Sequence, residues 1–307
     1  MSSSARLGVM AMAVIVGLVA GACGDSADPS TPRAPGNLEV VATTSILGDV
    51  VGNIVGEDGT VEVLIPAGVD PHDYRASSQQ TAAIQRADLV VANGLRLEEG
   101  LDDLLRSAID DGANILNIAE QVDPITFPDG EFDPHVWLDP IRMADATRLV
   151  AAELTAIDDS VDWAARAEAY AATLVSTNEA ISAVLSGIRD DDRKLVTNHD
   201  SLRYFAHRYG FEIVGVVIPG GSTLAAPSSG ELADLVAAID REEVPAIFAD
   251  TTAAMDLAEA IAREATADIA VVELSTGSLG EPGSGAETLV GMLQTNAGRI
   301  ADALSGT

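Results

Sequence analysis

The sequence predicts an α/β fold of two lobes, each a parallel sheet flanked by helices, with a ligand cleft between them. Short apolar runs alternate with amphipathic stretches over residues 37–140, and the same alternation returns over residues 191–307. Strands that alternate with helices are typical of parallel sheets built from right-handed crossovers. A helical region at residues 141–190 separates the two halves. We therefore expect an N-terminal lobe, a linking helical region and a C-terminal lobe with these boundaries.

In the first half, four strand-like runs are separated by helical ones. The expected strands are residues 38–43, 61–66, 88–94 and 114–118, and the expected helices are residues 47–55, 78–86 and 98–109. Short apolar runs next to helical patterns indicate strand–helix–strand units, in which successive strands run parallel.

The second half repeats this scheme without a close sequence repeat. Its expected strands are residues 194–197, 211–218, 246–249 and 270–274, and its expected helices are residues 201–209, 229–243, 253–264 and 287–304. The repetition is therefore one of architecture.

A single long helix is expected in the linking region. After Asp159 and Ser160, which provide an N-cap signal, residues 161–188 contain no Pro and only one late Gly. Apolar residues recur there at helical spacing, and such a helix would be about 42 Å long at ~1.5 Å per residue. That length would join two lobes as a rigid strut. An ordinary packing helix inside one domain is the alternative.

The N-terminus is expected to be a targeting segment. Residues 7–22 form an uncharged, mostly apolar run after Arg6, shorter than the ~18 residues of a spanning helix but suited to a signal peptide. The small residues before Cys23 resemble a bacterial lipobox, although Ala20 stands where that motif usually has Leu. We expect a signal peptide at residues 1–22, lipidation of Cys23, which is the only Cys, and a lipid-anchored tether at residues 23–36.

The composition limits the partners. The chain has 48 acidic and 17 basic residues, and its formal net charge is −31. An anionic surface of this size disfavours nucleic acid and anionic lipid headgroups. A solvated, solubilising surface explains the charge best, since specific metal binding comes from a site and not from net charge.

Three of the four histidines lie in short segments beside strand-like runs: His72 in Asp-Pro-His-Asp-Tyr, His135 in Asp-Pro-His-Val-Trp and His199 in Thr-Asn-His-Asp. Neutral imidazole is a common ligand of borderline metals, and a metal needs ligands from separate parts of a fold. Ligands of open parallel sheets bind beyond the carboxyl ends of strands. We expect His72 and His135 on one side of the cleft and His199 on the other. Three unrelated histidines are the alternative, and His207 is expected to be a surface or packing residue.

Acidic neighbours are expected to support these imidazoles. A ligating His usually donates its other ring N–H to an acceptor. Asp73, Asp133 and Asp200 are close in sequence to the three histidines and are candidate acceptors, with helix capping as the alternative role.

Together these segments resemble the zinc- and manganese-binding lipoproteins of bacterial ABC importers, the solute-binding family called cluster A-I. The resemblance is carried by residues 71–74, 133–140 and 196–199, and by residues 292–296 in the C-terminal stretch. It covers nearly all of the chain after the signal peptide.

The resemblance implies a ligand set. It assigns His72, His135 and His199 as metal ligands, with a carboxylate, usually Asp, at the end of the last strand of the C-terminal lobe. Glu273 is the candidate at that position, and the change from Asp to Glu alters its reach. Asp250, which ends the preceding strand, is the alternative fourth ligand.

Three imidazoles and one carboxylate favour zinc, because carboxylate-rich ligand sets favour manganese and affinity order places Zn²⁺ above Mn²⁺. Many zinc-binding members carry a His-rich loop in the first lobe, whereas the equivalent segment here, residues 121–131, is short and acidic. Mn²⁺ is therefore the alternative.

The implied function is a monomeric extracytoplasmic receptor, lipid-anchored to a bacterial cell membrane, that captures Zn²⁺ and delivers it to the permease of an ABC importer. No catalysis is implied. A zinc hydrolase is the rival hypothesis, but it needs an open metal position and a general base, and no His-Glu-x-x-His motif occurs. A surface antigen with a structural metal is the third possibility.

Overall fold

The first sheet consists of four parallel strands. The computed structural model describes residues 38–253 and 255–305, so the predicted signal peptide, tether and Cys23 lie outside the described residues. The strand order is β2-β1-β3-β4. The strands are β1 (Leu38–Thr44), β2 (Gly59–Ile65), β3 (Leu89–Ala92) and β4 (Ile115–Asn117).

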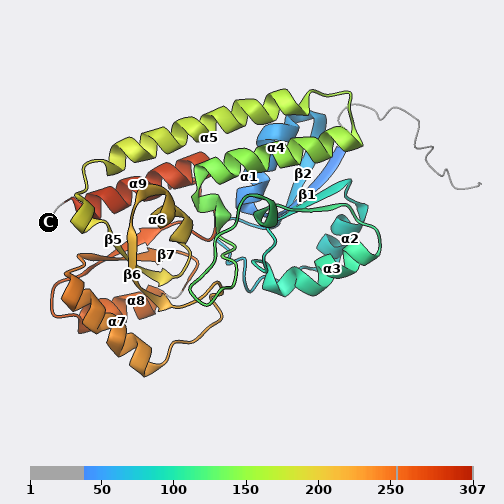
Figure 1. The fold of residues 1–307 in the computed structure, drawn as a ribbon. Coiled ribbons are helices and arrows are strands. Elements are labelled where there is room, and N and C mark those ends of the chain that lie inside the picture. The colour runs from blue at the N-terminus through green and yellow to red at the C-terminus, as the bar shows by residue number, and fades with distance from the viewer. Residues whose placement is uncertain (1–37, 254, 306–307) are drawn as a thin grey trace, which may run out of the picture. The chain divides into compact units, whose positions relative to one another are not determined.

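Helices cover both faces of this sheet (Figure 1). They are α1 (Ser45–Val55), α2 (Ser78–Arg86) and α3 (Asp102–Asp110), with short 3-10 turns η1 (Gly56–Asp58), η2 (Glu99–Leu101) and η3 (Ala119–Gln121). Side chains alternate between the faces of β1: Val40 and Ala42 belong to one core with α1, and Val41 to another with α2 and α3. This is the alternation that a strand imposes on its side chains.

The second sheet has the order β6-β5-β7-β8, again with all strands parallel. Its strands are β5 (Lys194–His199), β6 (Glu212–Ile218), β7 (Ala246–Asp250) and β8 (Ala270–Leu274). Its helices are α6 (Arg203–Tyr209), α7 (Ser229–Glu242), α8 (Met255–Glu264) and α9 (Leu289–Leu304), and the turn η5 (Asp190–Asp192) precedes it. β5 is two residues longer than predicted, so His199 is the last residue of a strand.

Two antiparallel helices connect the sheets: α4 (Pro140–Ile157), which follows the turn η4 (Val136–Leu138), and α5 (Trp163–Leu185). The predicted helix at 161–188 is therefore shorter at both ends. Asp162 caps it by accepting the N–H of Ala165 at 3.0 Å, while Ser160 hydrogen bonds to Asp158 instead. At the other end, the helix stops at the residue before Ser186 and Gly187.

α5 spans both sheets, packing on α4 and α1 along one part and on α9 along another (Figure 1). Its buried residues Ala167, Leu174 and Ile181 lie in one apolar core with residues of both sheets. Burial of such a shared core disfavours separation of the lobes, because exposing apolar surface to water costs about 25 cal/mol of free energy per Å².

None of the helices in the described parts of the chain has both the length and the apolar character that a bilayer span requires.

A buried carboxylate joins the two halves beside the start of α4. Asp139 is fully buried, and its side chain caps α4 by accepting the N–H of Ile141 at 2.9 Å. It also accepts hydrogen bonds from Arg142 of the same helix and from Arg208 of α6, whose Nε and Nη2 lie 2.9 and 2.7 Å away. Two guanidinium groups and a helix end therefore depend on one carboxylate.

Replacement of Asp139 by Ala should lower the free energy of unfolding by about 3–5 kcal/mol, because removing one partner leaves buried charge without compensation. The matched control is Asp145→Ala, which removes an exposed partner of Arg148 on the same helix. The control should change stability by less than about 0.5 kcal/mol. Urea denaturation of both variants measures the difference, and equal effects would contradict this role of Asp139.

Candidate metal centre

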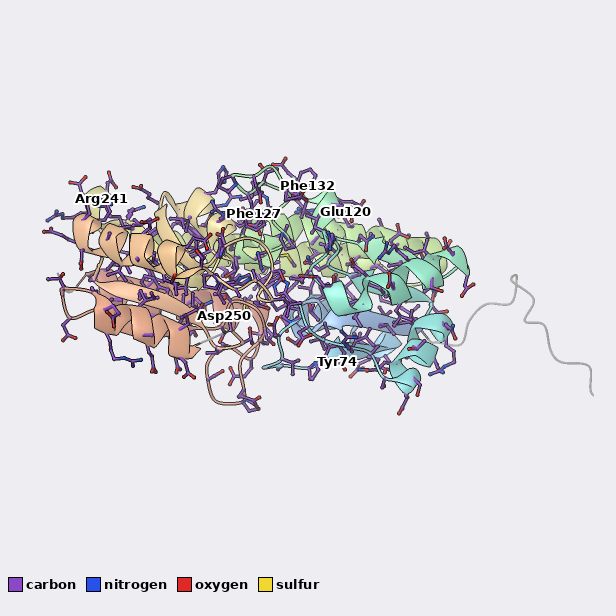
Figure 2. The ribbon with its side chains drawn as sticks, turned by 90° about the horizontal axis from the view of Figure 1, so that it is seen from below. Tyr74, Glu120, Phe127, Phe132, Arg241 and Asp250 are labelled. Carbon is purple, nitrogen blue, oxygen red and sulfur yellow. The ribbon has the colours of Figure 1, made fainter. Side chains whose placement is uncertain are left out.

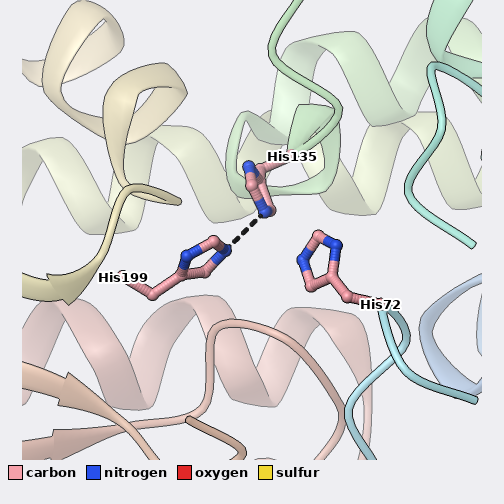
Figure 3. A group of neighbouring side chains, drawn as sticks. All are labelled: His72, His135 and His199. Carbon is pink, nitrogen blue, oxygen red and sulfur yellow. Dashed lines mark hydrogen bonds between the residues drawn. The ribbon is translucent and has the colours of Figure 1, made fainter. Parts of the chain in front are cut away.

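Three histidines from separate segments converge between the two sheets. His72 lies in the loop after β2, His135 directly precedes η4, and His199 ends β5. Each offers a ring nitrogen, and these three atoms lie within 4.8 Å of one another. The Nε2 atoms of His135 and His199 are 3.0 Å apart, and Figure 3 shows the three rings facing a common space. Among the described residues, no other group of three or more His, Cys, Asp or Glu has this spacing.

An Asp-Pro-His turn holds His72. Asp70 accepts the backbone N–H of His72 at 2.9 Å through Oδ1. Its other oxygen, Oδ2, accepts the hydroxyl of Thr223 at 2.6 Å. Because Thr223 follows β6 of the second sheet, this hydrogen bond ties the His72 loop to the other lobe.

A second Asp-Pro-His turn holds His135. Asp133 Oδ1 accepts its backbone N–H at 2.9 Å and lies 2.7 Å from its ring Nδ1. We assign the proton to Nδ1, because Oδ1 already accepts the backbone N–H and can accept the ring N–H in the same way. Nε2 then presents its lone pair toward His199. The next aromatic residue, Trp137, donates its indole N–H to Thr276 O at 2.7 Å, which fixes this segment to the loop after β8.

The environment keeps two of the imidazoles neutral. Burial, and then the neighbouring His135, lowers the pKa of His72 to about 3. The same causes, with His72 added, lower the pKa of His199 well below its ordinary value. A metal binds the neutral imidazole, so these two side chains need not lose a proton to coordinate at neutral pH.

Glu273, the carboxylate expected as the fourth ligand, is not brought to the three histidines. Its side chain is exposed on β8, and its backbone carbonyl accepts a hydrogen bond from Arg299 at 2.8 Å. Strand register explains this position. Glu273 of β8 pairs with Ala249 of β7. Thr197 of β5 pairs with Phe248, so His199, two residues farther along β5, is level with Asp250 and not with Ala249. Since side chains alternate between faces, Glu273 and His199 are on opposite faces of the sheet.

Asp250, the alternative carboxylate, lies on the same face as His199 by the same register. It ends β7, on the side of the second sheet that is turned toward the first lobe (Figure 2). Its Oδ1 accepts the N–H of Thr252 at 3.0 Å, while its buried Oδ2 has no hydrogen-bond partner among the described residues. Burial raises its pKa. Asp250 does not belong to the group within 4.8 Å, but its buried carboxylate lies on the face of the sheet that bears His199, where the side chains of Thr276 and Thr252 lower its pKa by hydrogen bonding.

Of the other predicted neighbours, only Asp133 reaches the ring of its histidine. Asp200 forms an ion pair with Arg203 at 2.8 Å, and Asp73 is exposed. His207 is exposed on α6, as expected for a surface residue. The roles of Asp70 and Thr223 were missed. The role of Asp70 could have been predicted, because the motif Asp-Pro-His occurs at both His72 and His135. No sequence pattern pointed to Thr223, which is distant in sequence from His72.

Comparisons with known proteins identify relatives of this chain. The family model described as zinc-uptake complex component A, periplasmic, matches residues 40–303. A manganese-binding lipoprotein MntA of Halalkalibacterium halodurans is 31% identical, over 95% of this chain and 96% of that protein. The zinc-binding protein TroA of Treponema pallidum is 30% identical, over 89% and 90%.

The solved structure of the periplasmic zinc-binding protein TroA from Treponema pallidum superposes with a TM-score of 0.80 and 28% sequence identity. The superposition covers 88% of this chain and 100% of the TroA chain. The predicted two-lobe α/β fold is thus confirmed. From the match over residues 40–303 and the 31% identity to a relative along nearly its whole length, the chain belongs to the family of zinc-uptake complex component A, the periplasmic metal-binding proteins.

Proposed function

We propose that this protein is the extracytoplasmic receptor of a bacterial ABC importer, and that it captures Zn²⁺ between its lobes and presents it to a membrane permease. The observation that carries the proposal is the convergence of His72, His135 and His199 from three separate segments into one buried group. Buried imidazoles without charge are suited to a borderline metal cation. The family membership supports the same role in uptake.

For the fourth ligand we favour Asp250 over Glu273. Asp250 is buried on the face of the sheet that bears His199, and its Oδ2 makes no hydrogen bond of good geometry among the described residues. Glu273 would have to cross the sheet. With Asp250, the site has three nitrogens and one oxygen, a set that suits tetrahedral Zn²⁺. Mn²⁺ is the alternative cargo, and the relatives named above include both zinc- and manganese-binding proteins.

A binding role suits this site better than hydrolysis. Four protein ligands fill a tetrahedral zinc site, whereas catalytic zinc normally keeps one position for water.

We further propose that Cys23 carries the lipid anchor, that residues 23–36 form the tether, and that the protein acts as a monomer. The lobes would then comprise residues 37–140 and 191–307, with residues 141–190 as the linking region.

Titration of the purified protein with Zn²⁺ and Mn²⁺ tests the cargo. We expect tight one-to-one binding of Zn²⁺ that Mn²⁺ does not displace, and loss of binding in His135→Ala. At metal near ~1,000 times the dissociation constant, linkage predicts about 4 kcal/mol of stabilisation. This corresponds to a rise in melting temperature of roughly 8–16 °C.

A preference for Mn²⁺ in that titration would change the cargo but keep the class of protein. Absence of any metal-dependent shift would refute the proposed function. A structural metal makes a different prediction, since its removal would unfold the protein. We expect the metal-free protein to remain folded, which circular dichroism in the presence of a chelator can check.

The fourth ligand is tested by Asp250→Asn, with Glu273→Gln as the matched control. Asn keeps the shape of Asp but removes the charge that a cation needs. Loss of a residue that only hydrogen bonds to a metal ligand typically weakens metal binding roughly 10–100-fold. Because Asp250 would itself be a ligand, we expect the Zn²⁺ affinity of Asp250→Asn to fall by more than that. Glu273→Gln should bind like the wild type. Competition with a chromophoric chelator measures both, and the reverse pattern would return the assignment to Glu273.

A further inference from the structure

We propose that Glu99 is a positioning residue for His72, and that its carboxylate accepts the Nδ1–H of His72 when Nε2 binds the metal. The inference rests on the proposed function, because it concerns how one of the proposed ligands is held. It names a residue that is remote from His72 in sequence and that belongs to the turn η2.

The two Asp-Pro-His turns differ in one respect. Both aspartates accept the backbone N–H of their histidine at 2.9 Å. Asp133 also reaches the ring Nδ1 of His135, at 2.7 Å. Asp70 does not reach the ring of His72, and its second oxygen is engaged by Thr223 across the lobes. The imidazole of His72 therefore needs an acceptor from elsewhere.

Glu99 lies where such an acceptor is needed. His72 Nδ1 is buried and has no hydrogen-bond partner among the described residues. Glu99 Oε1 is 4.0 Å from it and belongs to the only carboxylate that approaches it this closely in the described chain. The side chain of His72 is 2% exposed and that of Glu99 is 27% exposed. A shift of about 1 Å would bring the pair to hydrogen-bond distance.

The assignment of ring nitrogens agrees with this arrangement. Since Nδ1 of His72 faces Glu99, Nε2 is the nitrogen that is turned toward the other two rings (Figure 3). His135 presents Nε2 in the same way, with its Nδ1 against a carboxylate. A carboxylate behind a ligating imidazole fixes its tautomer and orientation and raises its basicity. Glu99 would give His72 the support that Asp133 gives His135.

The backbone fixes Glu99 relative to His72. A Cβ at the next residue, Gly100, would lie 2.1 Å from the carbonyl oxygen of Tyr74, so η2 packs directly against the His72 loop. Leu101 is fully buried in the core against which Tyr74 packs. The turn and the loop therefore form one packed unit, in which only the Glu99 side chain must adjust.

The test compares Glu99→Ala, Glu99→Gln and a control, Asp103→Ala. Asp103 is fully exposed on α3 four residues away, and its removal makes the same change in charge. For Glu99→Ala we expect about 10–100-fold weaker Zn²⁺ binding, the usual cost of losing such a partner. Glu99→Gln keeps a carbonyl acceptor and should recover part of the affinity. Asp103→Ala should bind like the wild type.

Nuclear magnetic resonance of the zinc-loaded protein supplies a readout that a purely structural role would not change. We expect a slowly exchanging Nδ1–H signal from His72 in the wild type and its loss in Glu99→Ala, while the corresponding His135 signal remains in both. The melting temperature of the metal-free protein should be the same in wild type and variant.

Wild-type affinity and an unchanged His72 signal in Glu99→Ala would overturn the role of Glu99 while leaving the proposed function intact. Equal loss in Asp103→Ala would also overturn it, because the effect would then be one of net charge. A wild-type protein that binds no Zn²⁺ or Mn²⁺ would overturn both proposals.

Discussion

Three buried imidazoles share one space between two sheets, and most of the surrounding structure follows from that constraint. Protonating His72 or His199 there is unfavourable because the charge would be buried beside other rings. Neutral rings offer lone pairs, but a lone pair is useful only when the ring is turned correctly and its other nitrogen is satisfied. Asp133 meets this requirement for His135, because its carboxylate lies against the ring Nδ1. We propose that Glu99 does the same for His72.

Such a group forms only if the lobes are held at a fixed separation. α5 and the apolar core shared by both sheets provide a rigid frame, and the buried Asp139 joins α4 to Arg208 of α6. A wide hinge motion would have to open that core. The loops that contain Asp70 and Thr223 are joined across the lobes, among the described residues, by a single side-chain hydrogen bond. Capture and release of a cation are therefore better explained by local loop movement than by separation of the lobes.

Much of this architecture could be predicted from the sequence, because periodicity reports which residues are buried. The family and the two-lobe fold are confirmed, and the helix at 78–86 and the strand at 270–274 have the predicted bounds. The predicted start of α5 was wrong because Asp162, not the earlier Asp159–Ser160 pair, provides the N-cap. Caps depend on side-chain geometry, which composition alone does not fix.

The carboxylates were harder to predict, since their roles depend on register and on contacts between distant segments. A shift of one residue along β8 decides the face on which Glu273 lies. Burial raises the pKa of Asp70, Asp200 and Asp250, so ionising these side chains has a cost in the absence of a cation. A divalent cation among the histidines would reverse that cost, because its charge favours the ionised forms nearby. Binding of a cation near these acids would thus add to the stability of the folded protein. That coupling would let a site that contains the neutral imidazoles of His72 and His199 favour a positively charged occupant.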